Sequence, residues 1–97
     1  MNDKFYSAYS AHCLRFYCRY DQPKLNSKID ELNWNACNRA FQRLEQEDQN
    51  LLKRLFQDDI DMTTVNQAAH SASLTPESIW KKIRKLERYV AEERGLI

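Results

Sequence analysis

The sequence is poor in the residues that build tight turns, because its 97 residues include one Gly and two Pro. A many-stranded β fold needs a turn after each strand, and Gly and Pro dominate such turns. A single Gly also leaves no glycine-rich loop of the kind that cradles phosphates in nucleotide-using enzymes. We therefore expect an all-α fold and no enzymatic activity.

Long apolar runs and export signals are also missing. No segment approaches the roughly 18 apolar residues that a membrane span needs. The start of the chain, Met1-Asn2-Asp3-Lys4, lacks the charged-then-apolar organisation of a secretory signal. We expect a cytoplasmic protein without a membrane partner. In that reducing compartment the three cysteines are interpreted as small core thiols: Cys13, Cys18 and Cys37.

Metal-ligating patterns are sparse. His12, Cys13 and Cys18 have poor zinc spacing, and no second ligand pair follows them. Acidic residues between helices are usually solvated turn formers, and this interpretation applies to Asp58, Asp59 and Asp61. The two histidines, His12 and His70, have no carboxylate or cysteine partner at useful spacing. We expect no metal and no cofactor.

The charges nearly cancel, with 15 Lys plus Arg against 14 Asp plus Glu and a net charge of +1. Such a balance supplies no general attraction to nucleic acid. Any nucleic-acid binding must therefore come from positive charge gathered on one face. The length fits one domain, which we divide into an N-terminal helical pair, residues 1–43, and a C-terminal part, residues 44–97.

The N-terminal part reads as two helices. Residues 3–20 place one stripe of mostly aromatic side chains at helical spacing: Phe5, Tyr9, Cys13, Phe16 and Tyr20. Tyr6 and Tyr17 widen that apolar face, and Pro23 lies in the break that follows. From Ser27 a second helix is apolar over more than half of its circumference, through Ile29, Leu32, Trp34, Ala36, Cys37, Ala40, Phe41 and Leu44. We expect this second helix to be the centre of the fold.

The C-terminal part reads as three helices. A third helix begins in the acidic run Glu45 to Asp48, where negative charge suits a helix start, and buries Leu51, Leu52, Leu55 and Phe56. Thr64 with Gln67 fits a capping box for a short fourth helix over residues 65–72, with Ala68, Ala69 and Ala72 inward. Thr75 and Pro76 then predict a sharp start for a fifth helix, which Gly95 ends.

The fifth helix has two well-separated faces. At about 100° per residue, Ile79, Ile83, Leu86 and Val90 fall in one narrow sector. Four basic residues cluster on nearly the opposite side: Lys81, Arg84, Lys85 and Arg88. Trp80 lies at the border of the apolar sector and is interpreted as a packing residue. The glutamates nearby, at positions 77, 87, 92 and 93, leave open that the basic face is only solvated.

A short capped helix, a turn and a second capped helix make up a helix-turn-helix, the arrangement that lets the second helix enter a DNA major groove. Ala69 fits the place where the two helices approach closely, and Ile79 anchors the second helix. Leu74 is the apolar turn residue expected to fill the angle between them.

Residues 65–83 read VNQAAHSASLTPESIWKKI, and this stretch resembles the helix-turn-helix of region four of bacterial sigma factors. Residues 44–56, LEQEDQNLLKRLF, resemble the helix that leads into that motif. The ending RYVAEERGLI and the small size look like phage-encoded transcriptional regulators of the ArpU/RinA kind, which are similar to region four. The resemblance covers residues 44–97 and implies a DNA-binding regulator of transcription from a phage or prophage.

Two positions depart from the motif. Ser73 stands where the motif usually has Gly, so the turn is expected to find its positive φ elsewhere or to use a different turn. Lys82 stands where the second helix usually has its second apolar residue, and we expect Ile83 to take that role.

The expected site lies on the fifth helix. Residues near its start, Glu77, Ser78 and Lys81, would point toward base edges because such a helix enters the groove N-terminus first. Residues further along, Arg84, Lys85 and Arg88, are better placed for phosphates. The expected partner is double-stranded DNA.

Two other interpretations stay open. In the first, the fifth helix pairs its apolar stripe with another helix, and the protein is a protein-protein interaction module without direct DNA binding. In the second, a sigma-like fold contacts RNA polymerase rather than DNA. We also expect a homodimer through the aromatic first helix, since one helix-turn-helix usually needs a second copy for adequate affinity.

Overall fold

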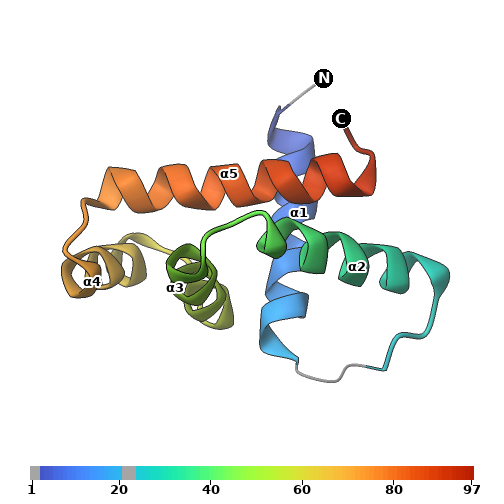
Figure 1. The fold of residues 1–97 in the computed structure, drawn as a ribbon, viewed down its shortest axis with the longest axis horizontal. Coiled ribbons are helices and arrows are strands. Elements are labelled where there is room, and N and C mark those ends of the chain that lie inside the picture. Colours follow the sequence, from blue (N-terminus) through green and yellow to red (C-terminus); the bar gives the residue numbers. More distant parts are fainter. Residues whose placement is uncertain (1–2, 21–23) are drawn as a thin grey trace.

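A computed structural model describes residues 3–20 and 24–97, with the side chains of residues 3–5 outside this description. These residues form five α-helices and no strand, which confirms the predicted all-α bundle (Figure 1). The helices are Asp3–Arg19 (α1), Lys28–Gln42 (α2), Gln46–Gln57 (α3), Met62–Ala72 (α4) and Pro76–Arg94 (α5). No helix in the described part is long and apolar enough to cross a membrane. The expectations for the Phe5 side chain and for Pro23 lie outside the described residues.

Capping interactions close several helix ends, and those at the two ends of α5 are the predicted ones. The Ser27 hydroxyl accepts a hydrogen bond from the backbone N–H of Asp30 at 3.1 Å and caps α2. The Thr75 hydroxyl accepts from the N–H of Ser78 at 3.2 Å, and Pro76 occupies the first turn of α5. Gly95 follows the last residue of α5 with a φ of 76°, the left-handed conformation that glycine adopts without a Cβ clash. The predicted limits of α5 are therefore confirmed to within one residue.

The predicted start of α4 is wrong. Its capping box joins Asp61 to Thr64, because the Asp61 carboxylate accepts from the N–H of Thr64 at 2.9 Å and the Thr64 hydroxyl accepts from the N–H of Asp61 at 3.0 Å. Thr64 therefore serves as the third residue of a box rather than the cap of one with Gln67. The Asp carboxylate is as good a cap as a hydroxyl and starts the helix at Met62, three residues before Val65.

The turn between α4 and α5 uses Ser73 itself. Ser73 has a φ of 56°, so the expectation that the turn avoids a positive φ at this position is wrong. The N–H of Leu74 donates to the carbonyl of Ala69 at 2.8 Å, and the N–H of Ser73 donates to that of His70 at 3.3 Å. Together these two bonds form a Schellman motif. They stabilise Ser73 in the left-handed conformation, which is unfavourable for a residue with a Cβ.

Leu74 does not fill the angle of this turn. Leu74 is 39% exposed, whereas Val65, Ala69 and Ile79 are at most 2% exposed. The backbone bond of Leu74 to Ala69 fixes the turn, while buried residues of the two helices fill the angle. The burial of Ala69 is as predicted, although Ala68 is half-buried and Ala72 is exposed.

The centre of the fold is α5 and not α2. Helix α5 packs against each of the other four helices, while α2 packs mainly against α1 and α5. Figure 1 shows that the first half of α2 extends past the end of α5, which leaves Ile29 58% and Leu32 38% exposed. Burial in α2 is therefore confined to its second half, at Ala36, Cys37, Ala40 and Phe41.

Helix α1 buries a different face from the predicted aromatic stripe. Its buried residues are Ser10, Cys13, Leu14 and Cys18, of which the stripe contained only Cys13. Phe16 and Tyr20 are 39% and 53% exposed, and Tyr20 follows the last residue of the helix. Apart from Leu14, these buried side chains of α1 are small. The hydroxyl of Tyr17 instead donates to Asn38 at 2.9 Å on α2.

Candidate nucleic-acid interface

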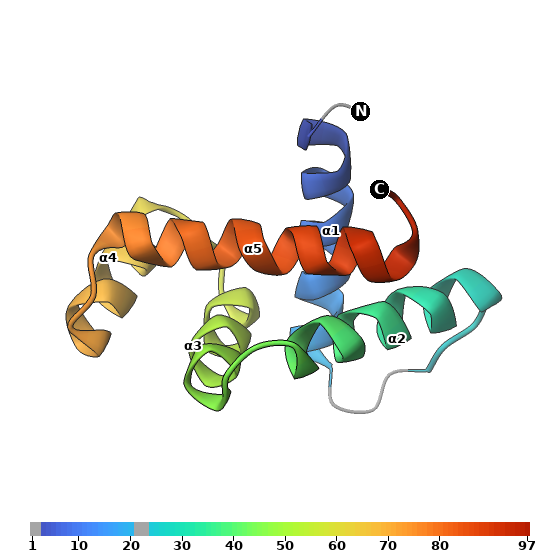
Figure 2. The same ribbon diagram turned by 45° about the horizontal axis from the view of Figure 1, so that its top comes forward.

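The two predicted faces of α5 are present in the structure. The apolar stripe of Ile79, Ile83, Leu86 and Val90 is at most 3% exposed, and Ala91 is also buried. The four cations of the opposite side are all exposed: Lys81, Arg84, Lys85 and Arg88. We call these four residues the basic face. Figures 1 and 2 show that the other helices leave the first half of α5 uncovered on one side.

The remaining site residues lie at the start of α5. Glu77 is exposed on its first turn. Ser78 is half-buried, and its backbone N–H is already bonded to the Thr75 hydroxyl, so its own hydroxyl is the group available to a ligand. All six residues predicted for the site therefore lie on one helix. Five of them are exposed.

Lys82, the departure from the motif, has a structural partner. Its ammonium lies 2.9 Å from the Asp48 carboxylate at the start of α3, and the side chains are 28% and 25% exposed. Ile83 is 3% exposed and fills the core as predicted. Lys82 therefore joins α5 to α3 and is not part of the basic face.

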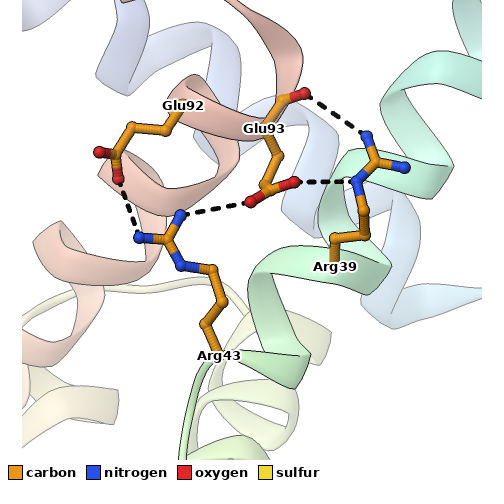
Figure 3. Close-up of polar contacts among 4 residues, drawn as sticks. All are labelled: Arg39, Arg43, Glu92 and Glu93. Carbon is orange, nitrogen blue, oxygen red and sulfur yellow. Dashed lines mark hydrogen bonds and ion pairs between the residues drawn. The ribbon is translucent and has the colours of Figure 1, made fainter.

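Two glutamates at the end of α5 point toward arginines of the second helix. Figure 3 shows Arg39 and Arg43 reaching from the end of α2 to Glu92 and Glu93. The Arg39 Nε donates to Glu93 at 2.8 Å. Arg43 lies 3.3 Å from Glu92 and 3.4 Å from Glu93. We call these four residues the α2–α5 network, and its two positive charges neutralise the two negative ones.

The glutamate in the middle of α5 is turned toward α1. Glu87 is half-buried, and burial raises the pKa of its carboxyl, while a hydrogen bond from Ser7 and the charge of Arg84 act in the opposite direction. Of the four glutamates on α5, only Glu77 is both exposed and outside these interactions. Three of the four glutamates of α5 therefore have partners outside α5: Glu87 in Ser7, and Glu92 and Glu93 in Arg39 and Arg43.

The cations of the basic face are not paired in this way in the described part of the chain, although the charge of Arg84 acts on the Glu87 carboxyl. Among the described residues, no salt bridge involves Lys81, Arg84, Lys85 or Arg88. The Lys85 ammonium lies 5.6 Å from the centre of the Tyr89 ring, close enough for a cation–π contact that leaves its charge accessible. The face therefore presents four positive charges in about two turns of helix.

Other candidate sites have structural explanations. Asp59 lies 3.3 Å from Arg19, and Asp61 caps α4. The described residues contain no group of three or more His, Cys, Asp or Glu arranged to hold a metal. The three cysteines are free and buried, and burial raises the pKa of the Cys18 thiol to about 12, which keeps it protonated near neutral pH.

Sequence reasoning missed the α2–α5 network and the Lys82 pair. Their partners are separated by dozens of residues, and no local spacing signals them. It also missed a groove of about 460 Å³ between α3 and α4, lined by polar residues such as Asn50, Arg54 and Gln67 together with apolar ones. No family model, curated protein or solved structure matches the chain. The site is therefore interpreted from its own geometry.

Proposed function

We propose that the chain binds double-stranded DNA through the basic face of α5 and acts as a small regulator of transcription without enzymatic activity. The observation that carries the proposal is the separation of charge on this helix. The four exposed cations form no salt bridge among the described residues, although the charge of Arg84 acts on Glu87, and Glu92 and Glu93 are paired with Arg39 and Arg43. A phosphate backbone is the partner that a compact, unneutralised basic face attracts.

The arrangement of the two last helices supports the duplex as the form of nucleic acid. Helix α4, a three-residue connection and α5 form a helix-turn-helix, and α5 is uncovered at the end that such proteins insert into the major groove. In this proposal Glu77, Ser78 and Lys81 contact base edges. Arg84, Lys85 and Arg88 contact phosphates. The resemblance of residues 44–97 to sigma region four adds to the same proposal.

In the rival interpretation, the apolar stripe of α5 pairs with a helix of another molecule. In this fold that stripe is buried against the rest of the chain and is not available to another molecule. Another protein could instead bind the exposed apolar residues near the connection of α1 and α2, which are Phe16, Tyr20, Ile29 and Leu32. RNA polymerase or a second copy of the chain is the partner to test there.

Self-association is tested by sedimentation of the wild type and of Tyr20→Ser at micromolar concentration. We expect a wild-type dimer that the substitution weakens, because Tyr20 is 53% exposed at the end of α1. A monomer at every concentration would count against the homodimer. In that case the protein would bind DNA as a monomer, or the exposed apolar surface would bind a different protein.

DNA binding is tested by gel shift on a selected and a random duplex at several salt concentrations. Arg84→Ala should weaken binding to both duplexes and reduce the salt slope by about one unit, because one fewer counterion is released. Ser78→Ala should change the preference between the duplexes with little change in slope, since a neutral hydroxyl releases no counterion. Lys28→Ala, on the exposed start of α2, is the matched control and should change neither. Equal slopes for wild type, Arg84→Ala and Ser78→Ala would contradict the proposal.

A further inference from the structure

We propose that Arg39 and Arg43, which lie outside the basic face, control its affinity for DNA by holding Glu92 and Glu93 away from it. This inference rests on the proposed function and names residues that regulate the same surface without contacting the ligand. It starts from the α2–α5 network, in which Arg39 of α2 pairs with Glu93, and Arg43, directly after α2, pairs with Glu92 and Glu93 (Figure 3).

Spacing along α5 gives Glu92 a second potential partner. Residues four apart lie next to each other on a helix, and oppositely charged pairs at this spacing attract. Glu92 is four residues after Arg88, so an unpaired Glu92 would lie beside the last cation of the basic face. In the structure it pairs instead with Arg43 at 3.3 Å. Arg43 therefore leaves the Arg88 guanidinium available for a phosphate.

The two arginines are committed to the network by several contacts each. Arg39 donates from Nε to the Glu93 carboxylate at 2.8 Å and from a terminal nitrogen to the Glu93 backbone carbonyl at 3.4 Å. Arg43 bonds both glutamates, and its guanidinium carbon lies 3.8 Å from the centre of the Tyr89 ring. Because the guanidinium groups already bond the glutamates, we infer that the two arginines neutralise Glu92 and Glu93 rather than bind phosphates.

Distance makes the effect local. Glu92 lies about one helical turn from Arg88 and about two turns from Lys85. The separation from Arg88 is within the Debye length, which is roughly 8 Å at physiological salt. Two uncompensated carboxylates there would reduce the positive potential of the basic face and would repel an approaching phosphate backbone. Their neutralisation is therefore part of what makes α5 attractive to DNA.

Two double variants and one quadruple variant test the inference, and none of them can form the ion pairs of the α2–α5 network. Arg39→Gln/Arg43→Gln leaves two free carboxylates, Glu92→Gln/Glu93→Gln leaves two free guanidinium groups, and the quadruple variant leaves neither. Thermal unfolding first establishes that each is folded at the temperature of the binding assay. Affinity for one selected duplex is then measured by fluorescence anisotropy at low and at physiological salt.

We expect the double arginine variant to bind about fivefold more weakly than wild type at low salt, with a smaller loss at higher salt. The double glutamate variant should bind at least as tightly as wild type. The quadruple variant, with its charges again balanced, should bind like wild type with the same salt slope. Lys24→Gln/Lys28→Gln removes two charges at and just before the start of α2 and should weaken binding much less than the arginine pair does.

Two results would overturn the inference. A quadruple variant that binds weakly, with a salt slope reduced by about two units, would show that the arginines contact phosphates directly. An arginine variant that binds like wild type, or no more weakly than the lysine control, would show that the network does not influence the basic face. Wild-type protein that binds no duplex at low salt would instead contradict the proposed function itself.

Discussion

Helices α5 and α1 are both amphipathic, yet the structure uses their apolar residues in opposite ways. In α5 the whole predicted stripe is at most 3% exposed. In α1 the exposed residues include Phe16, at 39%, while Ser10 and Leu14 are fully buried. The difference lies in the width of the apolar face. Helix α5 has one narrow stripe and one way to bury it, whereas α1 has aromatic side chains around much of its surface.

The width of an apolar face determines how strongly it specifies the orientation of a helix. A narrow stripe specifies the orientation of a helix, because any rotation exposes apolar groups and buries charged ones. A wide apolar face allows several orientations, and the packing partner selects among them. In α1 the buried side carries Ser10, Cys13, Leu14 and Cys18, while the rings of Tyr17 and Trp34 meet at a tilt between α1 and α2, with their centres 4.6 Å apart.

The largest expected effect compares one substitution in the two regions. Leu86→Ala should destabilise the protein by about 3 kcal/mol, because this fully buried side chain of α5 leaves a cavity. Leu32→Ala, at a site 38% exposed on α2, should cost less than about 1 kcal/mol. Urea unfolding of both variants is the measurement. Similar losses would mean that the start of α2 is covered in solution, as a dimer would cover it.

The next effect tests the close approach of α4 and α5. Ala69→Leu should destabilise by about 1–3 kcal/mol, because Ala69 is 2% exposed and added methylenes would push the helices apart. His70→Leu, the same new side chain on the exposed neighbouring position, should cost much less. Thermal melting of the pair measures the difference. An unchanged melting temperature for Ala69→Leu would contradict the packing of the helix-turn-helix.

A smaller effect, of opposite sign, is expected inside α1. Ser10 is 0% exposed, and its hydroxyl has no hydrogen-bond partner among the described residues. Ser10→Ala removes this unpaired group and should stabilise the protein by about 1 kcal/mol in urea unfolding. Ser71→Ala, at an exposed position of α4, is the control and should be close to neutral. A clear loss of stability in Ser10→Ala would indicate a hydrogen bond for this hydroxyl.

The strained turn residue gives the next prediction. Ser73→Gly should raise stability by about 0.5 kcal/mol, because glycine adopts the φ of 56° without a Cβ clash, although it also gains entropy in the unfolded chain. Ser71→Gly, within α4, should lower stability instead. Melting temperatures that shift in the same direction for both variants would argue against a left-handed Ser73.

The smallest effect depends on pH. Burial raises the pKa of Glu87, so the folded state binds this proton more readily than the unfolded state does. The cost of burying the charge is therefore present at neutral pH and is relieved as the pH falls through the raised pKa. Glu87→Gln should be slightly more stable than wild type at pH 7, and this advantage should shrink on acidification. Melting curves from pH 7 to 4 measure it, and an advantage that grows at low pH would reverse the assignment.

The number of helices, the limits of α5 and the division of its surface could be predicted from the amino-acid sequence, because caps and helical periodicity are local properties. The sequence also supplied all six residues of the candidate site, since they lie on one helix. The buried side of α1, the central place of α5 rather than α2, and the directions of Glu92 and Glu93 could not be predicted, because they depend on how the helices pack. These outcomes depend on contacts between residues such as Arg43 and Glu92, which lie 49 positions apart. No local pattern records such a contact, because it exists only once the helices have packed.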